Sequence, residues 1–229
     1  PRQHNMALLE ETWRWYGPKD PVSLSDVKQS GATGIVTALH DIPIGQVWGE
    51  EAILAMKTQI EANGLRWSVV ESIPVHDCIK RGAPERDEYI TNYCTSIRNL
   101  GKCGINRVCY NFMPVIDWSR TDLARKWPDG SHALAFDMID LAAFDLHILQ
   151  RPGAAADYSV KLRSQASARF ESMSTDQRTT LFKTVTAGLP GTMVAATDSV
   201  EAFQAALDAY KGINADALRE NLAYFLRGV

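Results

Sequence analysis

The feature that most constrains the fold is a repeat of strand-like and helix-like segments in the first half of the chain. Apolar or aromatic runs suited to strands lie at residues 12–17, 34–39, 66–72 and 105–113. Helical patterns with apolar side chains along one face follow the second and third runs, at residues 50–63 and 84–100. The spacing of about 30 residues is that of a βα unit. We therefore predict four parallel strands joined by right-handed helical crossovers.

The pattern changes after Trp118, where we expect no further strand. Helices are predicted at residues 131–149, 158–173, 174–188, 199–210 and 215–227. One of them opens with the sequence STDQ at residues 174–177, which has the form of a capping box. We divide the chain into a disordered or tag-derived start at residues 1–11, four βα units at residues 12–117, and a helical segment at residues 118–229.

Composition excludes several classes of function. The chain has 229 residues, of which 45% are hydrophobic, and a formal net charge of -3, so it offers no basic face for nucleic acid or an anionic membrane. No apolar run approaches the roughly 20 residues of a membrane-spanning helix, and the first residues lack the apolar core of a signal peptide. The four cysteines, Cys78, Cys94, Cys103 and Cys109, form no CxxC pair. We expect free thiols, a cytoplasmic protein and no zinc site.

Several long segments resemble one enzyme family, the mannonate dehydratases. They are TWRWYGPKDPVSL at 12–24, GATGIVTALHDIP at 31–43, WSVVESIPVHDCIK at 67–80, CYNFMPVIDWSRTDL at 109–123, FDMIDLAAFDLHILQRPGA at 136–154, AGLPG at 187–191 and LRENLAYFL at 218–226. The resemblance runs in order over nearly the whole chain from Thr12. It implies an α/β fold of the (β/α)8 TIM-barrel type, related to xylose isomerases, with a helical insertion after the fourth strand. This chain would carry the first four βα units and that insertion.

The resemblance also implies an activity. It implies a lyase that dehydrates D-mannonate to 2-keto-3-deoxy-D-gluconate in hexuronate catabolism, with Mn2+ or Fe2+ as cofactor. The family's metal ligands come from later strands, so we expect none of them before Val229 and expect activity only when the second half of the barrel is supplied. Cys109 lies on the fourth strand and does not correspond to the family's cysteine ligand. A homo-oligomer is expected.

Two other functions stay open at this point. A sugar or sugar-acid isomerase or epimerase on the same barrel would share a metal-stabilised, enolate-like intermediate. An inactive half-barrel that assembles with itself is the second alternative, because a sheet of four strands leaves two open edges.

Dehydration of a 3-hydroxy acid needs a base for the proton beside the carboxylate and an acid for the leaving hydroxide. In this class of barrel such groups stand at the C-terminal ends of the strands. Arg14, in the first strand, could hold a carboxylate by two hydrogen bonds, or form a salt bridge at the barrel rim. His40 directly follows the second strand and is our candidate catalytic residue, with a loop-ordering hydrogen bond as the alternative.

Further candidates follow the third and fourth strands. Glu71 closes the third strand and His76 lies in the next loop, so each could face the site, although Glu71 could instead pair with a cation. Tyr110, Asn111 and Asp117 belong to the fourth-strand segment. Asn111 is polar in an apolar strand and needs buried partners, either substrate hydroxyls or backbone groups. We expect these five residues, together with the arginine of the first strand, to bind a sugar-acid substrate.

Overall fold

The computed structural model describes residues 9–116, 118–187 and 199–229, which form two compact units. One unit comprises Pro1–Phe112 together with Asn214–Val229, and the other comprises Met113–Ile213. Each unit is considered by itself below. None of the described helices is long and apolar enough to cross a membrane.

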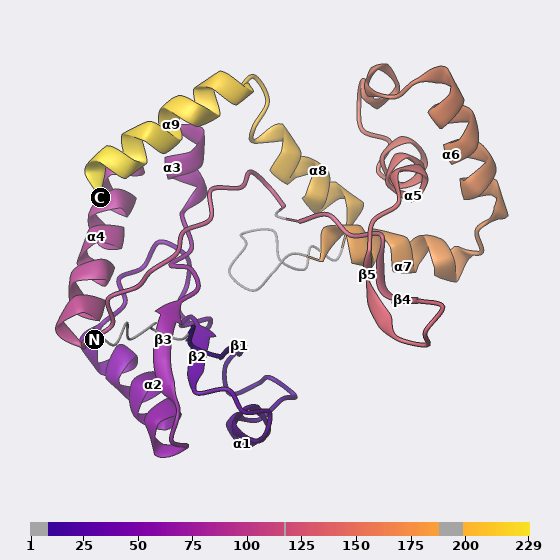
Figure 1. Cartoon of the computed structure of the whole chain (residues 1–229). Helices are drawn as coiled ribbons and strands as arrows, with labels where there is room; N and C mark the ends of the chain where they lie inside the picture. The colour runs from indigo at the N-terminus through magenta and orange to yellow at the C-terminus, as the bar shows by residue number, and fades with distance from the viewer. Residues whose placement is uncertain (1–8, 117, 188–198) are drawn as a thin grey trace, which may run out of the picture. The chain divides into compact units, whose positions relative to one another are not determined.

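A parallel sheet organises the first unit (Figure 1). Its strands are β1 (Thr12–Arg14), β2 (Gly34–Thr37) and β3 (Arg66–Val70), in the order β1-β2-β3. Residues 105–113 do not form the full fourth strand that we expected. They make one parallel bridge, between Val70 and Val108. In this bridge the Val70 N–H donates to the carbonyl of Arg107, and the Cys109 N–H donates to the carbonyl of Val70. The part of the chain that the structure describes places no strand on their other side.

Helices cover this sheet and pack on one another. They are α1 (Leu24–Gln29), α2 (Glu50–Ala62), α3 (Asp77–Arg81), α4 (Arg86–Lys102) and α9 (Ala215–Gly228). The helices predicted at 50–63, 84–100 and 215–227 are confirmed to within two residues at each end. α3 was not predicted; His76 caps its start and Gly82, with φ of 67°, ends it. α9 lies beside α3 and α4 (Figure 1), whereas we had grouped residues 118–229 as one segment.

The second unit begins with a β-hairpin, which corrects the prediction that no strand follows Trp118. β4 (Asp122–Lys126) pairs antiparallel with β5 (His132–Ala135). An Asp-Gly turn joins them: Asp129 Oδ1 accepts hydrogen bonds from the backbone N–H and the hydroxyl of Ser131, and Gly130 has φ of 87°. Since nearly every residue of both strands is exposed, the sequence lacks the alternating pattern that marks a strand with one buried face.

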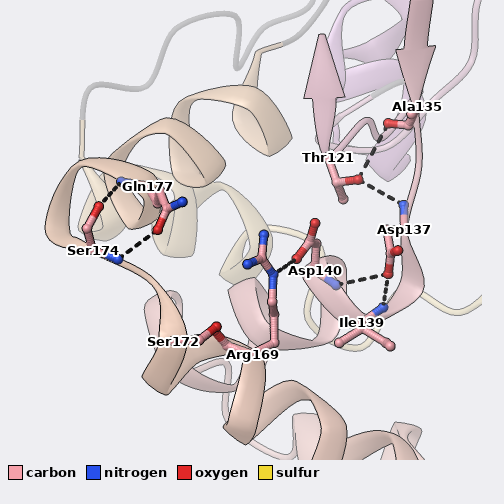
Figure 2. Close-up of polar contacts among 9 residues, drawn as sticks. All are labelled: Thr121, Ala135, Asp137, Ile139, Asp140, Arg169, Ser172, Ser174 and Gln177. Carbon is pink, nitrogen blue, oxygen red and sulfur yellow. Dashed lines mark hydrogen bonds and ion pairs between the residues drawn. The ribbon is translucent and has the colours of Figure 1, made fainter. Parts of the chain in front are cut away.

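Helices form the rest of the second unit. They are α5 (Met138–Ala143), the π-helix η1 (Phe144–Ile148), the 3-10 helix η2 (Ala154–Asp157), α6 (Val160–Ser172), α7 (Thr175–Thr186) and α8 (Val200–Asp208). The helix predicted from residue 131 begins only after Asp137, whose carboxylate caps α5. The capping box of α7 is confirmed, with Ser174 and Gln177 bonded to each other's backbone N–H (Figure 2). Phe144, Phe182 and Phe203 are buried in the core of this unit.

Candidate functional site

Polar side chains from four segments gather at the C-terminal ends of the parallel strands. Arg14 ends β1, His40 follows β2, Glu71 follows β3, and Asn111 lies three residues after the isolated bridge. Arg14 Nη1 lies 2.9 Å from Glu71 Oε1, and Asn111 Nδ2 donates a hydrogen bond to the same oxygen at 3.4 Å. We call Arg14, His40, Glu71 and Asn111 the strand-end cluster. Within this cluster, Glu71 contacts both Arg14 at the end of β1 and Asn111 beyond the isolated bridge.

The ion pair leaves one edge of the Arg14 guanidinium without a partner. Arg14 Nε and Nη2 are buried, and neither forms a hydrogen bond within the described residues. These two nitrogens make the edge that holds a carboxylate side-on. Arg151, in the other unit, demonstrates the geometry, because its Nε and Nη2 donate to the two oxygens of Asp145 at 2.9 and 2.8 Å. Arg14 is therefore fixed at Nη1 and unpaired at the edge that suits a carboxylate.

His40 has the chemical character of a proton acceptor. Its Nε2 is buried without a hydrogen-bond partner among the described residues. Burial lowers the pKa of His40, and the positive charge of Arg14 lowers this pKa further, whereas Glu71 and Asp41 oppose the shift. An imidazole with a lowered pKa is neutral at pH 7 and can accept a proton.

The loop after β1 packs against His40. Gly17 adopts φ of 93°, and a β-carbon there would stand 3.8 Å from His40 Cδ2. Asp20 holds this turn, because its carboxylate accepts hydrogen bonds from the backbone N–H groups of Tyr16 and Val22. The Tyr16 ring lies 6.3 Å from the His40 ring, and Arg14 Cζ lies 4.9 Å from the Tyr16 ring centre. The first strand and its loop thus contact both the cation and the imidazole of the cluster.

Comparison with known proteins decides the family to which this site belongs. The sequence model of D-mannonate dehydratase (UxuA) matches residues 9–229. The chain belongs to the D-mannonate dehydratase family. The resemblance seen in the sequence is thereby confirmed.

Individual members of the mannonate dehydratase family match the chain over almost all of its length. The mannonate dehydratases of Marinomonas sp. (strain MWYL1) and Chromohalobacter salexigens are each 51% identical over 221 residues, which is 96% of this chain and 56% of each relative. The crystal structure of mannonate dehydratase from Streptococcus suis serotype2 has a TM-score of 0.67 and 36% identity, over 97% of this chain and 50% of that one. The chain therefore spans about half the length of these mannonate dehydratases.

Two other predicted site residues, His76 and Tyr110, have no described contact with the strand-end cluster. His76 caps α3, since its Nδ1 accepts the backbone N–H of Cys78 at 3.1 Å, and its ring stacks on Tyr89 at 3.6 Å. Tyr110 is half exposed, with its ring 6.1 Å from that of Phe225 on α9. Asp117 lies outside the described residues. Their predicted part in binding substrate stays a prediction.

Two residues of the site were absent from the predicted set. Tyr16 lies beside both Arg14 and His40, as described above. Thr37 ends β2 fully buried, and its hydroxyl has no hydrogen-bond partner in the described part of the chain, while its carbonyl accepts the Glu71 N–H at 3.0 Å. A single hydroxyl in the otherwise apolar run GIVTAL is the signal that could have indicated Thr37.

The described residues of this dehydratase-family chain do not fit the metal that the family resemblance implies. Among them, no group of three or more His, Cys, Asp or Glu side chains could hold a metal ion. Within the strand-end cluster, Glu71 already binds Arg14 and Asn111. We therefore derive no chemical step at a metal from these residues.

Proposed function

We propose that the whole protein is a hydro-lyase that converts D-mannonate to 2-keto-3-deoxy-D-gluconate in the cytoplasm, as part of hexuronate catabolism. In this proposal the chain supplies the first four βα units of a (β/α)8 barrel, and its strand-end cluster forms one wall of the sugar-acid pocket. Membership of the mannonate dehydratase family supports the reaction. The observation that carries the site is the buried Nε–Nη2 edge of Arg14 at the C-terminal ends of the parallel strands, which has no hydrogen-bond partner among the residues that the structure describes.

Arg14 would bind the carboxylate of the substrate through Nε and Nη2. Glu71, bound to Nη1 at 2.9 Å, fixes the plane of the guanidinium, so the two donors are oriented before substrate arrives. Asn111 Nδ2 donates a hydrogen bond to the same Glu71 oxygen. A sugar acid offers the carboxylate that this edge requires, whereas a neutral sugar does not. This difference favours an acid substrate over the sugar isomerase alternative.

His40 would move the proton. Dehydration takes a proton from C2 and expels the C3 hydroxyl, which leaves as water once it has gained a proton; the resulting enol then becomes the 2-keto acid. The neutral imidazole of His40 is suited to accept the C2 proton at Nε2, an atom that has no other partner among the described residues. Arg14 assists by keeping the imidazole neutral.

A divalent cation, Mn2+ or Fe2+, belongs to the proposal through the family resemblance, and when bound it would stabilise negative charge that develops on the substrate. We propose that its ligands come from polypeptide after Val229. The relatives, of which this chain covers 56%, have the length for such ligands.

Kinetics of the whole enzyme test this proposal. We expect loss of water from D-mannonate and formation of a 2-keto-3-deoxy acid. Arg14→Gln should raise KM for D-mannonate by about tenfold to a hundredfold, the effect of losing a hydrogen-bonded charge pair. Arg66→Gln is the matched control. Arg66 is the first residue of β3, so it lies at the N-terminal end of the strand rather than the C-terminal end, and it pairs with Glu10. Interconversion of sugars without water loss would indicate an isomerase, and equal KM values in the two variants would remove Arg14 from the site.

A further inference from the structure

The second unit contains a cavity that the proposed reaction does not use. It has a volume of about 460 Å3 and lies between β4, α5, α6 and α7. Figure 2 shows four of the residues that line it, Thr121, Asp140, Arg169 and Gln177. Sites for small organic molecules have volumes of about 300–1,000 Å3. The cavity is therefore large enough for a small ligand.

The charged side chains of the cavity are mostly acidic. Asp122, Asp140 and Asp176 line it, and Arg169 is the one cation among its lining residues. Arg169 Nε is 2.7 Å from Asp140 Oδ1, so this pair is neutral as a whole (Figure 2). Neither Asp122 nor Asp176 forms an ion pair with any described residue, and the one hydrogen bond described for Asp122 comes from the N–H of Ala124. Both aspartates are exposed, and among the described residues neither of these two negative charges has a counter-charge.

A buried hydroxyl on α7 gives independent support for a ligand. Thr184 lines the cavity, is only 5% exposed, and makes no hydrogen bond with its side chain in the described part of the chain. Two other threonines of the same helix behave differently, because the hydroxyls of Thr179 and Thr186 donate to the carbonyls of Thr175 and Phe182. The Thr184 hydroxyl is therefore available to donate a hydrogen bond to a molecule in the cavity.

The apolar residues that line the cavity indicate that the ligand also has an apolar part. Leu123, Met173 and Leu181 all line the cavity. Met173 and Leu181 are buried, whereas Leu123, on the hairpin, is half exposed. Apolar surface beside two unpaired carboxylates suits a molecule with an apolar body and a positively charged end.

We propose that this cavity binds a small organic cation, a primary ammonium on a short apolar body. The ammonium pairs with Asp122 and Asp176 and donates to the Thr184 hydroxyl, while the body packs on Leu123, Met173 and Leu181. The proposal concerns the second unit alone and does not rest on the proposed dehydration.

The test uses phenethylammonium as the probe with the 229-residue chain, whose methionine methyl groups carry 13C. The Met173 resonance, assigned with Met173→Leu, should shift in a saturable way. The neutral isostere 2-phenylethanol and the anion 3-phenylpropionate should bind at least about fivefold more weakly, and added salt should weaken only the cation. Equal binding of either of these two compounds, or a Met173 resonance that does not move with the cation, would overturn the proposal.

Variants then assign the groups. Asp122→Asn and Asp176→Asn should each weaken binding of phenethylammonium about twofold to fivefold, the range for a partly exposed ion pair. Thr184→Val, which keeps the shape of the side chain, should also weaken it. Glu171→Gln is the matched control, because it removes one negative charge from α6 at a residue that does not line the cavity. If Glu171→Gln weakened binding as much as the two aspartate variants, the overall negative charge of the second unit, and not the cavity, would attract the cation.

Discussion

At the scale of single residues, the proton affinity of His40 is set by its burial and by the charges beside it, among them one ion pair. Burial and the charge of Arg14 lower the pKa of His40, and the carboxylate of Glu71 opposes them. Arg14 and Glu71 are bound to each other at 2.9 Å, so their effects on the imidazole partly cancel. Removing one partner exposes His40 to the full effect of the other.

We predict opposite pKa changes for two variants. Arg14→Gln should raise the pKa of His40, because the negative charges of Glu71 and Asp41 then act on it without the opposing cation, and Glu71→Gln should lower this pKa. Titration of the His40 ring resonances by NMR measures both values, with Arg66→Gln as a control that leaves the pKa unchanged. A shift of the same sign in the Arg14 and Glu71 variants would show that the electrostatic coupling is not as described.

Position along the strands predicted the four residues of the strand-end cluster, but the same reasoning also selected His76 and Tyr110, which have no described contact with it. Arg14, His40, Glu71 and Asn111 follow or end neighbouring segments, and parallel strands bring their C-terminal ends to one edge. The sequence could not show that Glu71 would occupy Nη1 of Arg14 and leave its side-on edge unpaired, because that depends on side-chain rotamers. Nor could it show that His76 would cap a helix as short as α3.

At the scale of elements, α9 is held to the first unit by a few specific contacts. Phe225 is 1% exposed, with its ring 4.9 Å from that of Tyr93 on α4. Asn221 Nδ2 donates to the carbonyl of Lys80 at 2.9 Å, and the Tyr224 hydroxyl donates to Asp87 at 2.8 Å. These contacts join residues about 140 positions apart in the sequence.

Phe225→Ala should therefore destabilise the first unit by about 3–5 kcal/mol, the range for removing a buried aromatic ring. Leu226→Ala is the matched control on the same helix, since Leu226 is exposed, and it should cost about 0.5 kcal/mol or less. Urea unfolding of both variants measures the difference. Equal losses would show that α9 does not pack as described.

The elements that could be predicted have strong local signals. α2, α4 and α9 show a helical apolar period, α7 opens with a capping box, and the predicted ranges of these helices are close to those observed. The hairpin of β4 and β5 has no buried face, so no period marked it. The packing of α9 on α3 and α4 depends on contacts between distant residues, which local patterns cannot indicate.

At the scale of the whole molecule, the parallel sheet has open edges. β1 pairs only with β2, and residues 107–109 pair only with Val70, among the residues that the structure describes. Unpaired strand edges attract further strands. In the proposed barrel, later strands of the same protein would cover them.

For this 229-residue chain alone, we predict self-association through those edges. Sedimentation equilibrium at several concentrations should give masses that are multiples of 25.4 kDa. The whole protein, with its edges covered, should show no further growth of the assembly with concentration. A stable, soluble monomer of the 229-residue chain at high concentration would contradict the open-edged sheet.

The most direct test of the account is a crystal structure of the whole protein with D-mannonate bound. We expect the two carboxylate oxygens to lie within hydrogen-bonding distance of Nε and Nη2 of Arg14, with Nη1 still bound to Glu71 and His40 beside the sugar acid. A carboxylate bound elsewhere, with the Nε–Nη2 edge of Arg14 filled by another part of the protein, would contradict it.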